Sequence, residues 1–260
     1  MTAPRNARPQ SGGGRKYVWS GTGQTEVFTS VTTVLQKVLA KPALPGWAAK
    51  CCGEYVVGHF GQLAQMMRSR QESAVVQLVK GAPWAISKAA GDRGTLVHAL
   101  AEAQTLGQTP SVPDEVRGYV TAWEHWVEDF AVTFEASEAT CYNRRTGIAG
   151  TFDALAEVKG LGLCLVDYKT GKDVYPKAAL QLTAYRFSDF IGMPDGVTEE
   201  PMPEVDKTVV LRLSDGDYDL VPVRSDPVMR MRWEMLVDLY DALQEQDWIG
   251  GSIRSGGRLL

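Results

Sequence analysis

An acid and a base stand two residues apart at the end of an apolar run in the middle of the chain. The run 163–166 (LCLV) predicts a buried strand, which ends on Asp167, Tyr168 and Lys169. Side chains at positions i and i+2 of a strand point to the same face, so the Asp167 carboxylate and the Lys169 ammonium group are expected side by side. Taken alone, the pair could be a simple salt bridge at a strand end.

Two more acids precede this pair in strand-like segments. Asp153 stands in GTFDALAEV, and the turn KGLG after it predicts a hairpin that brings Asp153 near Asp167. Glu138 stands one strand earlier, in FEASEAT. We therefore expect three carboxylates and the lysine Lys169 to converge from three successive strands.

Such a group of side chains has the chemistry of a divalent-cation site. Mg²⁺ prefers oxygen ligands in octahedral geometry and usually keeps water or phosphate in its remaining positions. A cation lowers the pKa of a bound water and offsets charge on a phosphodiester, and a neighbouring lysine can orient the water or stabilise developing charge. The combination of Asp153, Asp167 and Lys169 therefore favours metal-dependent phosphodiester hydrolysis over a structural salt bridge.

Two predicted helices add further candidates. His98 stands in RGTLVHALAE on a helix whose other face is apolar, and imidazole as a ligand favours Mn²⁺ over Mg²⁺. A structural role for this histidine is the open alternative. Gln181 and Tyr185 are four residues apart in ALQLTAYRF and share one helical face. This polar pair could meet the site or a DNA backbone, or it could belong to an ordinary half-buried helix.

The elements that must position these residues follow one another in a simple order. A flexible basic tail is expected over 1–16, then strands over 17–20 and 26–31, with Ser30 as a candidate cap of the next helix. Apolar periodicity predicts helices over 31–40, 44–60, 61–80, 84–90, 94–106 and 115–130. The remainder predicts an antiparallel meander over 131–143, 148–158 and 162–170, a helix over 179–192, a hairpin over 208–214 and 218–224, a helix over 226–246 and a loose tail over 251–260.

This order predicts an α/β fold, with a central mixed β-sheet flanked by helices and a helical N-terminal region. No linker is long or biased enough to require a second domain. A single domain is therefore expected over 17–250, mostly helical over 17–130 and carrying the sheet core over 131–250.

The composition narrows the classes of protein. The formal net charge of the 260 residues is −4, so a chain-wide basic field for coating nucleic acid is absent. No window approaches the ~18 continuous apolar residues of a membrane span, and the first residues lack the apolar segment of a secretory signal, so a cytoplasmic location is expected. The cysteines form no C-x-x-C pair, which favours buried thiols over a zinc ribbon or a disulfide framework: Cys51, Cys52, Cys141 and Cys164.

Five short motifs, in chain order, together resemble the PD-(D/E)XK nuclease superfamily. They are RGTLVH, SEATCY, AGTFDAL, VDYKTGK and QLTAY, and the resemblance spans roughly residues 28–190. Within the superfamily the chain is similar to the RecB-like, phage-type exonuclease branch, which includes the CRISPR-associated RecB-like exonucleases. The resemblance implies a restriction-endonuclease-like core and a metal-dependent DNA exonuclease that works from DNA ends in recombination, repair or replication.

The resemblance also implies roles for the residues in these motifs. His98, Asp153 and Asp167 would ligate one or two Mg²⁺ or Mn²⁺ ions with help from the Tyr168 carbonyl, and Lys169 would be the catalytic lysine. The accessory acid and the groups that support the site or contact DNA would be Glu138, Gln181 and Tyr185. The CRISPR-associated relatives hold an iron–sulfur cluster through cysteines near the C-terminus. Since no cysteine follows Cys164 here, no iron–sulfur cluster is expected.

Several basic and aromatic residues are weaker candidates for contact with single-stranded DNA or duplex ends. Arg144 and Arg145 lie in the turn before the Asp153 strand, and three more basic residues follow Lys169: Lys172, Lys177 and Arg186. Each could equally belong to a solvated charged face. Trp47 or Trp84 could stack on a base, but packing in the core is the favoured expectation for both.

Other functions remain open at this level. The same fold could serve as a non-catalytic DNA-binding or assembly module, although such a protein would be expected to lose one of Asp153, Asp167 and Lys169. A structure-specific endonuclease is a further alternative. A recombination partner protein and a homo-oligomer are possible, and no membrane partner is expected.

Overall fold

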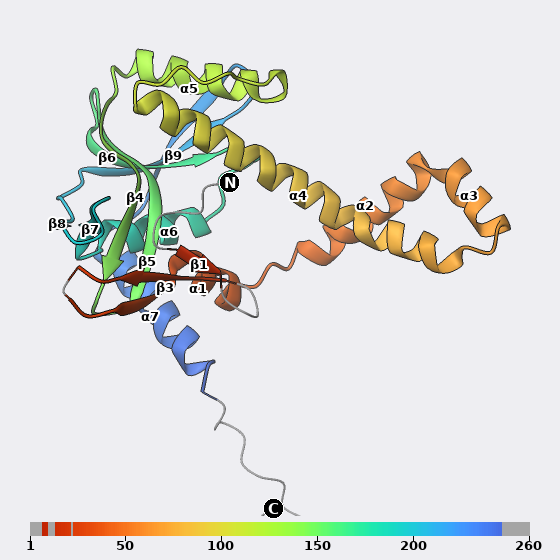
Figure 1. Ribbon diagram of the computed structural model, residues 1–260, viewed down its shortest axis with the longest axis horizontal. Helices are drawn as coiled ribbons and strands as arrows, with labels where there is room; N and C mark the ends of the chain where they lie inside the picture. The colour runs from red at the N-terminus through yellow and green to blue at the C-terminus, as the bar shows by residue number, and fades with distance from the viewer. Residues whose placement is uncertain (1–6, 10–13, 22, 246–260) are drawn as a thin grey trace, which may run out of the picture.

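The computed structural model describes residues 7–9, 14–21 and 23–245. They form a curled mixed sheet with helices on both faces, and a helical arm projects from one side of it (Figure 1). The predicted α/β class, the central mixed sheet and the helical N-terminal region are therefore confirmed. None of the described helices combines the length and the apolar character that crossing a bilayer requires.

Five long strands form the centre of the sheet in the spatial order β4, β5, β6, β9, β10. All neighbours in this series are antiparallel except β6 and β9, which run parallel. The predicted meander and late hairpin are confirmed, with β4 Thr133–Asn143, β5 Ile148–Val158, β6 Gly162–Lys169, β9 Lys207–Leu213 and β10 Tyr218–Val223. β5 is buried over almost its whole length, because strands pair with both of its edges and helices cover both of its faces.

Short strands extend the sheet around the start of β5 and the end of β4. β3 runs parallel to the first residues of β5, and β7 pairs with β4. The aromatic side chains of Trp19, Tyr142 and Phe190 pack together where these strands meet. The short strands are β1 Ala7–Pro9, β2 Arg15–Trp19, β3 Glu26–Ser30, β7 Phe190–Gly192 and β8 Glu199–Pro201.

Helices bury each face of the sheet in a separate apolar core. One face packs against α1 Val31–Val38, α6 Lys177–Arg186 and α7 Pro227–Ala242. The opposite face packs against the C-terminal part of α4 and against α5 Arg117–Asp129, which follows the short 3₁₀ helix η1 Asp114–Val116. α6 and α4 thus approach the same strands from opposite sides, and these are the two helices that carry Gln181 and His98.

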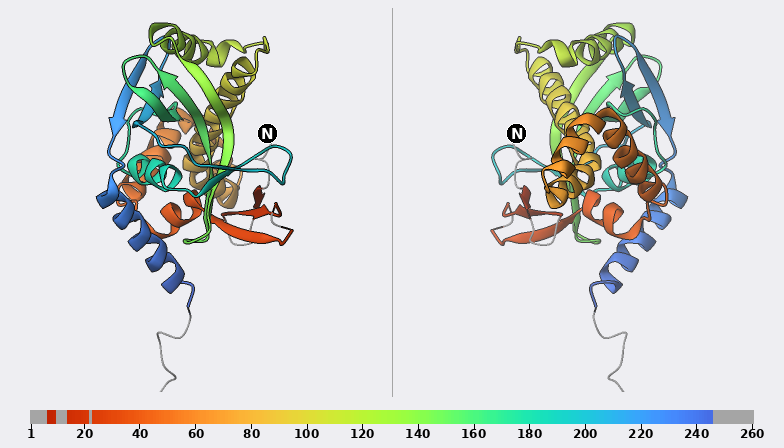
Figure 2. Two further views of the ribbon diagram at one scale, coloured as in Figure 1. Left: turned by 90° about the vertical axis from the view of Figure 1, so that its left-hand side faces the viewer. Right: turned by 90° about the vertical axis from the view of Figure 1, so that its right-hand side faces the viewer.

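The arm consists of α2, α3 and the first half of α4 (Figure 1). Their bounds are α2 Leu44–Gly58, α3 Phe60–Arg68 and α4 Glu72–Thr105. In the right-hand view of Figure 2 the arm points toward the viewer, away from the sheet. The prediction of separate helices over 84–90 and 94–106 is wrong, because one helix of 34 residues runs through both segments.

The Cys52 thiol replaces the backbone N–H donor that α4 lacks at Pro83. Proline has no N–H, so the carbonyl four residues earlier, that of Val79, loses its partner within the helix. The Cys52 Sγ of α2 donates to this carbonyl at 3.3 Å. The contact between α2 and α4 therefore satisfies the backbone at the point where the sequence predicts a break.

Four more predictions need correction. The prediction of a flexible tail over 1–16 is wrong for Ala7–Pro9 and for Arg15 and Lys16, because these residues lie in the paired strands β1 and β2. Residues 1–6 and 10–13 of this tail, and the loose tail predicted over 251–260, lie outside the described residues. The helix over 179–192 ends at Arg186, because the following residues pair with β4 as β7. Ser30 precedes α1, but its side chain bonds to Thr32 and does not cap the helix. The prediction that Trp47 and Trp84 pack in the core is wrong, because both residues are exposed on the arm.

Candidate active site

The site lies where two strands of the sheet separate. β5 and β6 pair as far as Ala154 and Val166, and β3 meets the same edge of β5 only at Ile148 and Ala149. Within the described chain, the short stretch of β5 between these pairings has no strand beside it on this edge. The Asp153 carboxylate fills the gap, since its Oδ2 accepts the backbone N–H of Tyr168 at 2.5 Å.

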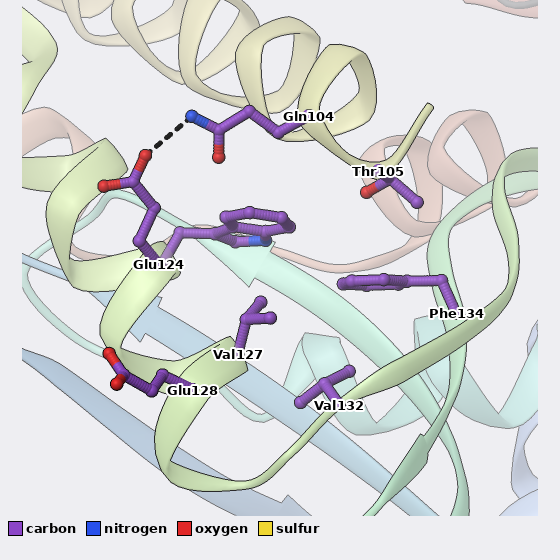
Figure 3. A pocket seen from close by; sticks show the side chains of 8 residues that line it. Gln104, Thr105, Glu124, Val127, Glu128, Val132 and Phe134 are labelled. Carbon is purple, nitrogen blue, oxygen red and sulfur yellow. Dashed lines mark hydrogen bonds between the residues drawn. The ribbon is translucent and has the colours of Figure 1, made fainter. Parts of the chain in front are cut away.

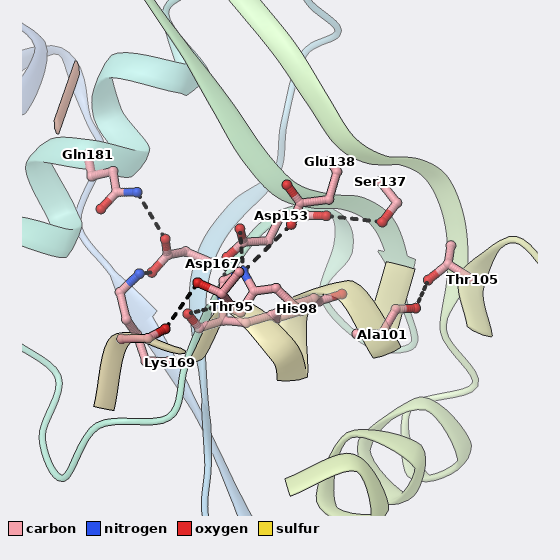
Figure 4. A network of polar contacts seen from close by, with 12 residues as sticks. Thr95, His98, Ala101, Thr105, Ser137, Glu138, Asp153, Asp167, Lys169 and Gln181 are labelled. Atoms are coloured by element: carbon pink, nitrogen blue, oxygen red, sulfur yellow. Dashed lines mark hydrogen bonds and ion pairs between the residues drawn. The ribbon is translucent and has the colours of Figure 1, made fainter. Parts of the chain in front are cut away.

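Three side chains from three elements meet in this gap (Figure 4). Nδ1 of His98 in α4 lies 3.1 Å from Oδ1 of Asp153 in β5 and 3.6 Å from Oε1 of Glu138 in β4. One potential ligand atom from each of the three residues lies within 4.8 Å of the others. Nε2 of His98 lies 3.2 Å from the Tyr168 carbonyl oxygen, which fixes the ring between strand and helix.

The backbone at Glu138 is strained in a way that serves this contact. Its φ is +48°, in the left-handed region that side chains other than glycine rarely adopt. Such a conformation costs about 1–2 kcal/mol and persists where the surroundings hold it, most often at functional sites. The irregular stretch of β4, which also shifts register between Phe134 and Ala136, thus brings the Glu138 carboxylate to His98.

A second group of polar side chains adjoins the first on the α6 side. The Asp167 side chain is almost fully buried and forms an ion pair with Nζ of Lys169, as its position two residues away predicts. Gln181 donates its Nε2–H to Oδ1 of Asp167 at 3.1 Å, and the same nitrogen lies 3.1 Å from the Tyr185 hydroxyl oxygen. A Cβ on Gly150 would stand 2.3 Å from the Tyr185 ring, so only glycine leaves room for this arrangement.

Opposite charges stabilise one another in this buried place. Burial lowers the pKa of His98, but the carboxylates of Asp153 and Glu138 outweigh it and raise this pKa to about 10. Burial raises the pKa of the Asp153 carboxyl, but His98 outweighs it, so the pKa is lower than usual. For Asp167 burial prevails over the attraction of Lys169, and the pKa of the carboxyl is raised. Burial likewise opposes the charge of Lys169, yet Asp167 raises its pKa.

The donor set fits a hard or borderline divalent cation. One imidazole nitrogen and two carboxylate oxygens within a few ångströms of one another suit Mg²⁺ or Mn²⁺, and the nitrogen favours Mn²⁺. Binding would require His98 to lose the proton that the carboxylates hold on it. The group of three potential ligands contains Glu138, which the sequence predicts only as an accessory acid. Asp167 lies beside this group, and its carboxylate oxygens contact Lys169 and Gln181. Ligation by Asp167 stays a prediction.

Basic groups gather on the α6 side of the site. Lys172 and Lys177 are exposed after β6, and burial and then the charges of Lys41 and Lys169 lower the pKa of Lys177. Lys41, at the base of the arm, had no signal in the sequence that pointed to the site. It is separated from Lys169 by more than a hundred residues, and only the fold brings their charges together.

The predicted arginines lie elsewhere and have protein partners. Arg144 forms ion pairs with Glu26 and Glu199 at the turn between β4 and β5, and Arg145 pairs with Glu234 of α7. Arg186 donates to the Ser225 hydroxyl and to the Val205 carbonyl. The structure therefore does not bring these three arginines to the site, and a role in DNA contact stays a prediction.

A separate hollow of about 430 Å³ opens between the end of α4, α5 and β4 (Figure 3). Trp123 and Phe134 stack along it, and Gln104 donates to Glu124 across its rim. None of the residues that line the hollow belongs to the candidate site, so the two features are distinct.

Comparison with known proteins leaves the family open. No protein-family model matches the chain, and no curated protein matches it. A similar solved structure is the crystal structure of SSO0001, with 14% sequence identity over 71% of this chain and 72% of that chain, and a TM-score of 0.30. A similarity at this level supports no conclusion about the fold or the function of this protein.

Proposed function

We propose that this protein is a divalent-metal-dependent deoxyribonuclease that hydrolyses phosphodiester bonds from DNA ends, as an exonuclease of recombination, repair or replication. The observation that carries the proposal is the contact of His98, Glu138 and Asp153 beside the buried pair of Asp167 and Lys169. The order α4, β4, β5, β6, α6 around the site is consistent with the restriction-endonuclease-like core that the sequence motifs imply.

The residues of the site have distinct tasks in this proposal. His98, Glu138 and Asp153 would hold Mg²⁺ or Mn²⁺, which when bound lowers the pKa of water and neutralises charge on the phosphate. The Tyr168 N–H holds one oxygen of Asp153, which fixes the direction of the other. Lys169 supplies a positive charge next to the acids, where it can orient the attacking water and stabilise the developing phosphate charge.

Gln181 and Tyr185 would orient the Asp167 carboxylate and would take no direct part in the reaction. The Gln181 amide holds Oδ1 of Asp167, and the buried Tyr185 hydroxyl holds the amide in turn. Substitution of a side chain that orients the groups around a metal commonly lowers metal affinity or activity by about 10–100-fold. The basic side chains of Lys41, Lys172 and Lys177 would attract the phosphates on either side of the scissile bond.

Digestion of end-labelled linear DNA tests the proposal. Single- and double-stranded DNA labelled at the 5′ or 3′ end is incubated with Mg²⁺, Mn²⁺ or EDTA. Wild-type protein should release label only with metal, and Lys169→Ala should reduce the rate by a factor of about 10²–10⁴, the usual contribution of a group that assists proton transfer. Lys159→Ala, at the exposed turn between β5 and β6, is the matched control and should keep full activity.

Two outcomes would overturn the proposal. One is the absence of metal-dependent cleavage on every substrate while DNA still binds, which supports a binding module. The other is equal activity of wild type and Lys169→Ala, which excludes this site. Cleavage of closed circular DNA at the same rate as linear DNA would show an endonuclease in place of an exonuclease.

A further inference from the structure

The arm, residues 41–93, is almost entirely surface. Within these residues, all of which the structure describes, only Cys51, Leu63 and Ala82 are buried. A segment of this length with so few buried side chains contributes little to the apolar core. Its exposed surface therefore needs an explanation other than support of the fold.

The charge of the arm is opposite to that of the rest of the molecule. It contains seven Lys and Arg against three Asp and Glu, a net charge of +4. Since the whole chain has a formal net charge of −4, the remainder has −8. A local positive charge on an acidic protein is complementary to a polyanion that must reach an acidic site.

One line of side chains on α4 combines this charge with an exposed aromatic ring. Lys80, Trp84 and Lys88 are spaced four residues apart, so they follow one another along one side of the helix. Trp84 is 81% exposed as a whole residue, and the Lys88 side chain is 70% exposed. These three residues are called the α4 stripe.

The α4 stripe is in line with the candidate active site. His98 is 18 residues beyond Lys80, which is five turns of an α-helix at about 3.6 residues per turn, so both side chains leave α4 in the same direction. Ala82, which packs within the arm, lies about 200° around the helix from Lys80 at about 100° per residue. The side of α4 that reaches the site at His98 is thus continued, further out, by the exposed stripe.

We propose that the α4 stripe binds the single-stranded part of the DNA whose phosphodiester bonds the site cleaves. This inference rests on the proposed function. Trp84 stacks on a base, and Lys80 and Lys88 pair with flanking phosphates, a combination that binds single strands without reading their sequence. A phosphate takes the place of Asp92, which pairs with the Lys88 ammonium group in the free protein.

The geometry sets the length of strand that reaches both places. Trp84 and His98 are 14 residues apart on one helix, or about 21 Å at a rise of about 1.5 Å per residue. At the roughly 3.4 Å per nucleotide of a stacked strand, this distance spans about six nucleotides. Strands shorter than that cannot occupy the site and the stripe together.

Exposed apolar side chains on other parts of the arm favour a different occupant, a second protein surface. Val57 and Phe60 are exposed near the junction of α2 and α3, and Ile86 is exposed on another side of α4. The stripe differs from them because its residues alternate cation, aromatic ring and cation, and because it is continuous with His98. Association of protein copies through the stripe is therefore the competing outcome.

The inference is tested by measuring how tightly the protein binds oligothymidylates of about 4 to 16 nucleotides. The measurement uses fluorescence anisotropy in the presence of EDTA, so that no cleavage occurs. The triple variant Lys80→Gln/Trp84→Ala/Lys88→Gln should bind the longer strands roughly tenfold or more weakly than wild type. The slope of log K against log salt should fall by about 1.4, which corresponds to two phosphate contacts on a single strand. Lys50→Gln/Ile86→Ala, exposed positions of the arm outside the stripe, is the matched control and should bind like wild type.

A second readout keeps this test separate from that of the proposed function. The metal-dependent hydrolysis of bis(p-nitrophenyl) phosphate is compared between wild type and Lys169→Ala. Because this substrate is too small to reach the arm, its hydrolysis reports on the candidate active site alone. Absence of this hydrolysis with stripe-dependent binding intact would overturn the proposed function and not the binding surface. Equal affinities of the stripe and control variants would overturn the inference. So would sedimentation showing that the stripe variant changes the association of protein copies and leaves DNA affinity unchanged.

Discussion

Gln181 donates its side-chain N–H to Oδ1 of Asp167 at 3.1 Å, while the other oxygen of the same carboxylate pairs with Lys169. The amide thus fixes the orientation of an acid that is buried beside the candidate cation site. Gln181→Ala should lower the rate of metal-dependent DNA hydrolysis by roughly 10–100-fold, because Asp167 loses this constraint. The measurement is the initial rate of digestion at saturating Mn²⁺.

Gln104→Ala is the matched control for this variant. Gln104 also donates to a carboxylate, that of Glu124, but at the far end of α4 and away from the site. It should leave the rate unchanged. If both glutamine variants lose activity to the same extent, the effect comes from stability and not from the orientation of Asp167.

Asp153→Asn should weaken the binding of Mn²⁺ by at least tenfold, because it removes a negative charge from the group of three ligands. Titration calorimetry measures the affinity, and the rise in melting temperature with added Mn²⁺ gives an independent value. Neither measurement requires DNA.

Asp206→Asn is the control for the metal experiment. Asp206 also accepts a backbone N–H from β6, that of Leu163 at 2.9 Å, yet it stands outside the group of three ligands. It should bind Mn²⁺ like wild type. Equal affinities of Asp153→Asn and wild type would show that the cation, if bound, is held elsewhere.

Cys52→Ala should lower the free energy of unfolding by about 0.5–1.5 kcal/mol, since the Val79 carbonyl loses the thiol that replaces the missing N–H of Pro83. In a Pro83→Ala background the backbone N–H of residue 83 returns, and the same cysteine substitution should cost less. Urea denaturation of the four proteins gives the coupling between the two positions. A coupling of zero would mean that the thiol does not substitute for the missing N–H of Pro83.

Asp226→Ala should lower the melting temperature by about 2–4 °C near neutral pH, because Oδ1 of Asp226 accepts the Met229 N–H and caps α7. Arg224, followed by the helix N–H groups, lowers the pKa of Asp226 below its ordinary value of 3.8. A lowered pKa in the folded state means that the ionised cap stabilises fully above the ordinary pKa, and that this stabilisation disappears as the pH falls through the lowered one. Calorimetric scans from pH 7 to about 2 should therefore show the difference shrinking.

Asp226→Asn separates the cap from the charge. Asparagine caps helices about as well as aspartate and does not titrate, so this variant should keep its melting temperature difference from Asp226→Ala at low pH. A loss that is the same for the alanine and asparagine variants would show that the ion pair with Arg224 matters, and not the cap.

The sequence predicts the strands of the site well because their signals are local. Alternation and turn residues identify β4, β5 and β6, and two-residue periodicity is enough to pair Asp167 with Lys169. The sequence identifies His98 only as a candidate ligand, because helical periodicity does not show which residues face its side chain. Its contact with Asp153 depends on how α4 crosses the sheet.

Other features depend on contacts that no local pattern contains. The central position of Glu138 comes from a left-handed backbone in the middle of β4, where the sequence reads as an ordinary strand. The guanidinium of Arg144 pairs with Glu26, 118 residues away. The exposure of Trp84 was not predictable either, because an apolar side chain on a helix gives no sign of whether its face meets protein or solvent.

The length of α4 has a consequence for local unfolding. Val97, Leu100 and Ala101 are buried under the sheet, whereas Ala82 is the only buried residue between Glu72 and Arg93. Amide hydrogens exchange through openings whose free energy rises with the number of buried contacts. A single unbroken helix should therefore exchange deuterium at two rates, fast in its projecting half and slow beside the sheet, and the boundary should fall within a turn or two of His98.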